Sequence, residues 1–160
     1  MGTNGQKSIS RLQWAMLDGG QSLTVRYRSN ERYPGVIEID CIGLVTDASV
    51  EAFWAALESP QGLASVVSVF NFTQAITTYR RPPRLVQGAP QMKPGCYVCR
   101  PDQYDAMWSR SELFNSLNVR RAVFLSQALA LEWAVSEVRL GLSRSPPLQR
   151  AQPDSAFRDR

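Results

Sequence analysis

The stretch from Tyr33 to Phe72 constrains the fold most, because two strand-like apolar runs flank one helical pattern. Gly35–Gly43 and Ser65–Phe72 are mostly apolar and of strand length, which is typical of strands covered on both faces. Between them, apolar side chains recur at the spacing of one helix face: Val50, Phe53, Trp54 and Leu57. The pattern predicts a strand–helix–strand unit.

The ends of this helix carry their own signals. Thr46 and Asp47 can cap its start, and Pro60 and Gly62 are expected to stop it. A unit of this kind places its two strands parallel and side by side, joined by a right-handed crossover over Asp47–Ser59.

The chain before this unit predicts one strand and leaves one element open. Gln21–Arg28 alternates as a strand does, and the polar turn that follows makes it an antiparallel neighbour of Gly35–Gly43. Upstream, the Asp18-Gly19-Gly20 turn favours a β-hairpin, whereas Arg11–Leu17 also fits a short amphipathic helix. Both alternatives stand.

The second half predicts strand, helix, strand, helix: Cys96–Arg100, Pro101–Leu117, Val119–Leu125 and Gln127–Leu140. Ser126 is expected to cap the last helix and Gly141 to end it. The apolar positions of the two helices are Tyr104, Met107, Trp108, Leu113 and Phe114, then Leu129, Leu131, Trp133, Val135 and Val138. The chain is therefore expected to be an α/β protein with a mixed four- to five-stranded sheet and packed helices.

A length of 160 residues allows one core of ordinary size. Residues 21–141 are expected to form that single domain. Residues 1–20 are expected to be a mobile N-terminal segment, with an extra strand or short helix as the open alternatives. Residues 142–160, polar and rich in proline, are expected to be a disordered tail.

Charge and hydropathy bear on the cellular location of the protein and on its class of partner. No apolar run is long enough to span a membrane and no export signal opens the sequence, which predicts a cytoplasmic protein. A net charge of +4 is too mild to predict nucleic-acid binding.

Three cysteines and no histidine exclude most common hydrolase chemistry, because no imidazole is present to act as base or metal ligand. Cys96 and Cys99 form a CxxC, but side chains three apart in a strand point to opposite faces, so they are expected to be core thiols. Cys41 is expected to pack in its strand. We expect no enzyme activity, no catalytic residue, no metal and no cofactor.

The segment Thr73–Gly95 is the candidate binding site. It contains four prolines and four cations without an acid, and it is long for a connection in a compact domain. One helical turn over Thr73–Tyr79 fits its start. The residues expected to contact a partner are Thr77, Thr78, Tyr79, Arg80, Arg81 and Arg84, since arginine binds carboxylates and phosphates in bidentate fashion.

An aromatic set offers the alternative of an apolar ligand pocket between helices and sheet: Phe53, Trp54, Trp108, Phe114, Phe124 and Trp133. Ordinary core packing explains the spacing of these residues better. A small apolar ligand is therefore the second hypothesis, behind a protein partner.

Two stretches, GVIEIDCIGLVTDASVEAFWAAL and RRAVFLSQALALEWA, resemble the STAS domain (sulfate transporter and anti-sigma factor antagonist), closest to its SpoIIAA-like branch, over about Gln21 to Leu140. The resemblance implies a mixed sheet with packed helices and a non-catalytic, regulatory, protein-binding role. The branch's Asp-Ser-(Ser/Thr)-Gly acceptor motif is absent, and Thr77 or Thr78 is the only hydroxyl near its expected place.

Overall fold

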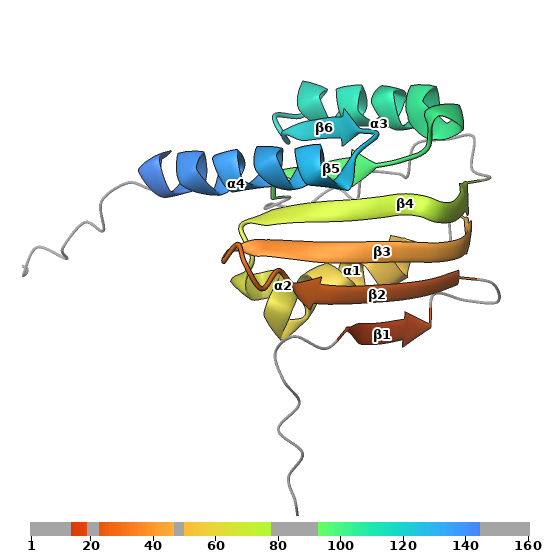
Figure 1. The fold of residues 1–160 in the computed structure, drawn as a ribbon, viewed down its shortest axis with the longest axis horizontal. Helices are drawn as coiled ribbons and strands as arrows, with labels where there is room; N and C mark the ends of the chain where they lie inside the picture. Colours follow the sequence, from red (N-terminus) through yellow and green to blue (C-terminus); the bar gives the residue numbers. More distant parts are fainter. Residues whose placement is uncertain (1–13, 19–22, 47–49, 78–92, 145–160) are drawn as a thin grey trace, which may run out of the picture.

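One mixed β-sheet organises the protein, which we describe from a computed structural model covering residues 14–18, 23–46, 50–77 and 93–144. Its six strands lie side by side in chain order (Figure 1). They are β1 Ala15–Asp18, β2 Leu23–Ser29, β3 Val36–Val45, β4 Val67–Thr77, β5 Gly95–Val98 and β6 Arg121–Phe124. Pairing is antiparallel from β1 to β3 and parallel from β3 to β6. The predicted α/β class with a mixed sheet is confirmed.

Helices cover both faces of this sheet. The helical elements are α1 Val50–Glu58, α2 Pro60–Ala64, the 3-10 turn η2 Pro101–Gln103, α3 Tyr104–Ser116 and α4 Gln127–Arg144. Phe53 of α1 and Met107 of α3 pack into the larger core cluster on one face. Ala130 and Ala134 of α4 pack into a second cluster on the other face, so the domain has three layers.

The strand–helix–strand prediction is confirmed, because β3 and β4 are adjacent and parallel on either side of α1. Pro60 does more than stop the helix. It opens α2, where the Ser59 hydroxyl oxygen accepts a hydrogen bond from the Gly62 amide at 3.0 Å. A Cβ at Gly62 would lie 2.2 Å from the Leu57 carbonyl oxygen, so the tight corner requires glycine. The predicted cap at Asp47 lies outside the described residues.

Both central strands run further than predicted. β3 passes through Gly43, which takes a φ of 108°, and ends at Val45. β4 continues to Thr77, so the expected loop over Thr73–Gly95 and the helical turn at its start are wrong for residues 73–77, which form strand. β3 supplies the reason, since its residues Ile42 to Val45 pair with Gln74 to Thr77 and provide the hydrogen bonds that a helical turn would otherwise make.

Three predictions about the helices are wrong. Trp108 is 47% exposed and Leu129 is 53% exposed, although both were expected to pack. The buried positions of α4 include Ala130 and Ala134, because a helix lying close to a sheet needs small side chains there. Gly141 does not end α4, which continues to Arg144; a Cβ there would lie 3.2 Å from Val66, so the glycine allows close packing.

The open alternative at the N-terminus is a strand. Residues 15–18 form β1, antiparallel to β2, as the hairpin reading predicted. β1 is therefore one outer strand of the sheet and β6 is the other.

Candidate interaction surface

The predicted binding residues fall at the edge of the described structure. Thr77 is the last residue of β4. Thr78, Tyr79, Arg80, Arg81 and Arg84 lie outside the described residues. The structure therefore defines the two ends of the segment: the carboxyl end of β4, and residues 93–95, where Lys93 Nζ donates to the carbonyl oxygens of Gly62, Leu63 and Ser65.

That end of β4 extends beyond its neighbour β5. The pairing between β4 and β5 ends at Asn71 and Val98, whereas β4 continues to Thr77. The pairing with β3 shifts between Asn71 and Gln74, which marks a β-bulge with one extra residue in β4. Backbone carbonyls past the bulge therefore need partners that β5 does not supply.

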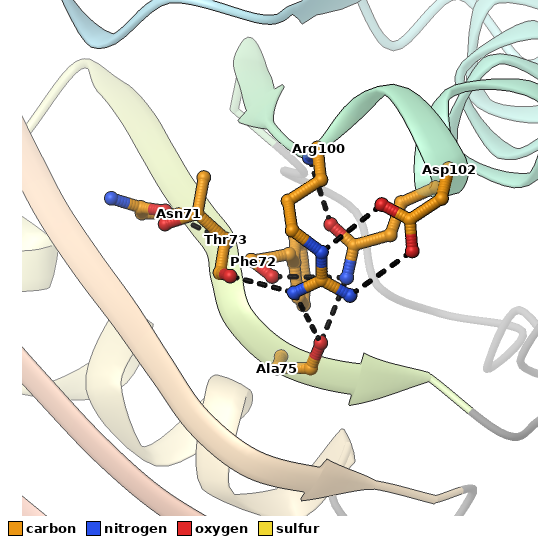
Figure 2. Close-up of polar contacts among 7 residues, drawn as sticks. Asn71, Phe72, Thr73, Ala75, Arg100 and Asp102 are labelled. Carbon is orange, nitrogen blue, oxygen red and sulfur yellow. Dashed lines mark hydrogen bonds and ion pairs between the residues drawn. The ribbon is translucent and has the colours of Figure 1, made fainter.

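Two side chains that follow β5 supply those partners (Figure 2). The Arg100 Nη1 donates to the carbonyl oxygens of Thr73 at 2.6 Å and Ala75 at 3.2 Å. The buried Gln103 Nε2 donates to the carbonyl oxygens of Phe72 at 3.1 Å and Ala75 at 2.8 Å. Gln103 is itself held, because its Oε1 accepts from the Arg100 amide at 2.9 Å.

The hydrogen bonds from Arg100 and Gln103 to β4 are called the anchor here. Polar contacts on either side complete it. Asn71 Oδ1 accepts from the amide and the hydroxyl of Thr73, at 2.9 and 2.6 Å, which stabilises the bulge from within. Asp102 pairs with Arg100 at 3.0 Å, and the hydrogen bond from Arg100 lowers the pKa of the Asp102 carboxyl. The carboxyl end of β4 is thus held firmly although β5 does not reach it.

The side chains that this end presents away from the larger core form the open face, defined here as Ile42, Leu44, Gln74 and Ile76. Ile42 and Leu44 alternate along β3 with Cys41 and Val45, which lie in the larger core, so they point to the opposite side. Gln74 lies beside Ile42, and Ile76 lies beside Leu44.

Three of the four residues of the open face are apolar; Gln74 and Ile76 are exposed, and Ile42 and Leu44 are partly exposed. Ile76 is 63% exposed, and none of the four residues belongs to either core cluster. α4 lies on this side of the sheet, but its first residue, Gln127, reaches Glu38, and Val138 further along lies near Gly35. The helix therefore runs toward the amino ends of the strands and does not extend over the carboxyl halves of β3 and β4 (Figure 1).

A charged ladder borders the open face. Arg26 pairs with Asp40 at 2.8 Å and Arg28 pairs with Glu38 at 3.1 Å, each across β2 and β3. Both guanidinium groups lie over the ring of Trp14. The Cζ atoms of Arg26 and Arg28 are 4.5 and 4.2 Å from the ring centroid. Cation–π contact and ion pairing together hold the four charges in place.

The cysteines behave as predicted for core thiols. Cys96 and Cys99 are buried in different core clusters, on opposite faces of the sheet, and both are free. Burial raises the pKa of Cys96 to about 12 and also raises the pKa values of Cys99 and Cys41. Reactive thiolates are therefore disfavoured at all three positions.

The aromatic set does not line one pocket. Phe53 packs edge-on against Phe70 and Phe72 on one face, whereas Phe124 contacts Trp133 on the other. A separate depression of about 470 Å³ lies between α2 and the start of β3. Its lining is Ser29, Pro34, Gly35, Val36, Pro60, Gln61, Ala64 and Ser65.

Comparison of the chain with family models, with curated proteins and with solved structures found no match. The described residues contain no helix long and apolar enough to cross a membrane. They also contain no group of three or more histidine, cysteine, aspartate or glutamate side chains placed to hold a metal ion.

Sequence reasoning missed the residues that build this surface. Arg100 and Gln103 look like an ordinary strand end and helix start, and their partners lie 25 to 31 positions earlier in the chain. A signal for Ile76 existed, because four of the six residues from Thr73 to Thr78 are β-branched, which favours a strand.

Proposed function

We propose that this chain is a non-catalytic protein-interaction module of the STAS-like type, with a regulatory role. Its partner offers an amphipathic helix, which lies on the open face and extends over the segment that follows Thr77. The observation that carries the proposal is an apolar surface on a parallel strand pair, where Ile76 is mostly exposed beside the partly exposed Ile42 and Leu44.

Parallel strands are ordinarily covered on both faces, because their crossovers place helices there. β3 and β4 follow this rule near their amino ends, where α4 packs, and depart from it past Asp40. One further helix beside α4 would complete the layer.

The dimensions fit a short helix. β3 from Cys41 to Val45 extends over about 17 Å at roughly 3.3 Å per residue, and a helix of about eleven residues has that length. Such a helix places apolar side chains at i, i+4 and i+7, which matches a strip made of Ile42, Leu44 and Ile76.

Charge favours an acidic flank on the partner helix. The Arg26–Asp40 pair beside the open face is neutral as a unit. The predicted basic segment with Arg80, Arg81 and Arg84 follows directly after Thr77 in sequence. Acidic side chains along one edge of the partner helix would be attracted to that segment.

The test uses a matched pair of exposed apolar residues. A partner recovered with the wild-type chain is purified and titrated against Ile76→Glu and Leu63→Glu. Ile76 is 63% exposed on β4 and Leu63 is 67% exposed on α2, so both variants should fold. We expect Ile76→Glu to weaken binding about tenfold or more and Leu63→Glu to change it less than about twofold. Equal affinities for the two variants would place the contact elsewhere.

A second candidate, a small-molecule carrier, is favoured by one observation, the depression of about 470 Å³ beside α2. Its volume lies in the range of ligand sites, about 300–1,000 Å³. A native mass spectrum of freshly purified protein separates the two functions. A co-purified ligand that is lost from a Gln61→Trp variant favours the carrier, and a bare chain favours the interaction module.

A further inference from the structure

The two outer strands of the sheet are protected differently. At β6, the Asn115 side chain closes the edge, since its Oδ1 accepts from the Arg121 amide at 2.9 Å and its Nδ2 donates to the Arg121 carbonyl at 3.0 Å. At β1, no described strand pairs with the outer edge. An unpaired edge of this kind is a template for another strand.

The register shows which backbone groups of β1 face outward. Asn30 donates to the Val36 carbonyl across β2 and β3, so the even-numbered residues of β2 bond to β3. Tyr27 and Val25 therefore bond to β1, where their partners are Ala15 and Leu17. The amide and carbonyl groups of Trp14, Met16 and Asp18 point away from the sheet.

We propose that two copies of the chain form a symmetric dimer in which their β1 strands pair antiparallel, centred on Met16. Met16 then lies opposite Met16 of the second copy, and Trp14 lies opposite Asp18. Every outward-facing group of the three residues gains a backbone partner. This inference is independent of the proposed helix-binding function.

The chemistry of the edge fits a second copy. An antiparallel edge is self-complementary, so one twofold axis brings identical groups into register. The only charged residue from Trp14 to Asp18 is Asp18, which meets Trp14 and not its own counterpart. The guanidinium groups over the Trp14 ring, those of Arg26 and Arg28, are already paired with Asp40 and Glu38, so this end of the edge is neutral and does not repel a second copy.

The competing register is poorer. Centring the pair on Leu17 would place Asp18 opposite Met16 and would leave the outward groups of Trp14 unpaired. A pair centred on Met16 therefore gives a hydrogen-bond partner to more of the outward backbone groups of β1. It also keeps the open faces of both copies on the same side, because the twofold axis stands perpendicular to the sheet.

The first experiment is disulfide trapping with Met16→Cys. Opposed residues of a hydrogen-bonded antiparallel pair have Cα atoms about 5.5 Å apart, which suits a disulfide. The native cysteines are all buried, so they give a low background. We expect Met16→Cys to form a covalent dimer under mild oxidation. Asp18→Cys is the control, since residue 18 does not meet its counterpart and should remain monomeric on a non-reducing gel.

The second experiment is a charge swap followed by sedimentation. Met16→Lys and Met16→Glu each place like charges opposite one another, so each variant alone should raise the dimer dissociation constant about tenfold. An equimolar mixture of the two should restore the dimer, which a folding defect would not allow. A wild-type chain that sediments as a monomer at every concentration, a mixture that stays monomeric, or cross-linking of Asp18→Cys as efficient as that of Met16→Cys would each overturn the proposal.

Discussion

The two halves of the β3–β4 pair differ in how they are covered. Near their amino ends the strands lie between α1 on one face and α4 on the other, and Val36, Val67 and Val69 are buried on the α4 side. Near their carboxyl ends α4 is absent, and Ile76 is mostly exposed. The strand composition changes little between the halves, so the difference comes from where the helices lie. An apolar strand residue is thus buried under α4 in one half, whereas Ile76 in the other half is exposed.

The largest effect expected from this comparison is on stability. Phe72 is 2% exposed and packs against Phe53, Phe70 and Tyr97 in the larger core. Phe72→Ala should lower the free energy of unfolding by about 3–5 kcal/mol, because it leaves a cavity. Ile76→Ala should change it by less than about 0.5 kcal/mol. Urea unfolding of both variants measures the contrast, and similar losses would show that the open face is covered.

A smaller loss of unfolding free energy is expected at the anchor that holds the carboxyl end of β4. Gln103 is 5% exposed and donates to two carbonyl oxygens of β4. Gln103→Ala removes the side-chain donor to the Phe72 carbonyl oxygen, leaves the Ala75 carbonyl oxygen with Arg100 alone, and should cost about 1–3 kcal/mol.

Hydrogen exchange locates that loss. Amides of residues 73–77 should lose protection in Gln103→Ala, whereas amides of β2 should keep theirs. The control is Ser109→Ala, which removes an exposed hydroxyl that bonds only within α3 and should leave protection in β4 unchanged. Uniform loss of protection across the sheet would contradict a local anchoring role.

The smallest effect on stability is expected from the segment that follows the open half. Arg80→Ala, Arg81→Ala and Arg84→Ala together should leave the melting temperature nearly unchanged and weaken the native partner's binding. The wild-type contact should also weaken with salt, since exposed charges are screened beyond about 8 Å at physiological ionic strength. Full affinity in the triple variant would confine the contact to the open face itself.

Much of the fold follows from local pattern. The apolar runs around Ile39 and Val69, with the helical spacing of Phe53 and Leu57 between them, predict the parallel pair that the structure contains. The alternation through Cys96 and Cys99 predicts thiols on opposite faces, and the two core clusters confirm it. These predictions succeed because period two and period 3.6 are properties of neighbouring residues.

The errors have a different origin. Trp108 has the position of a core residue in the helical pattern, yet it stacks on Tyr104 at the surface and donates to Glu112 at 2.9 Å. Amphipathic spacing predicts which residues share a helix side, but not how far the sheet extends beneath them. The same limit explains Leu129.

By itself the sequence determined the parallel central pair, the order of the strands and longer helices that follow it, and the burial of the three thiols, because each depends on hydrophobic periodicity within a short stretch. The tertiary structure decided that β1 and α2 form, that β4 extends beyond β5, that Arg100 and Gln103 donate to carbonyls of β4 that β5 does not reach, and that Ile42, Leu44 and Ile76 lie side by side. Those outcomes depend on strand lengths and register compared across the sheet, between residues about 30 positions apart, and no local pattern contains that comparison.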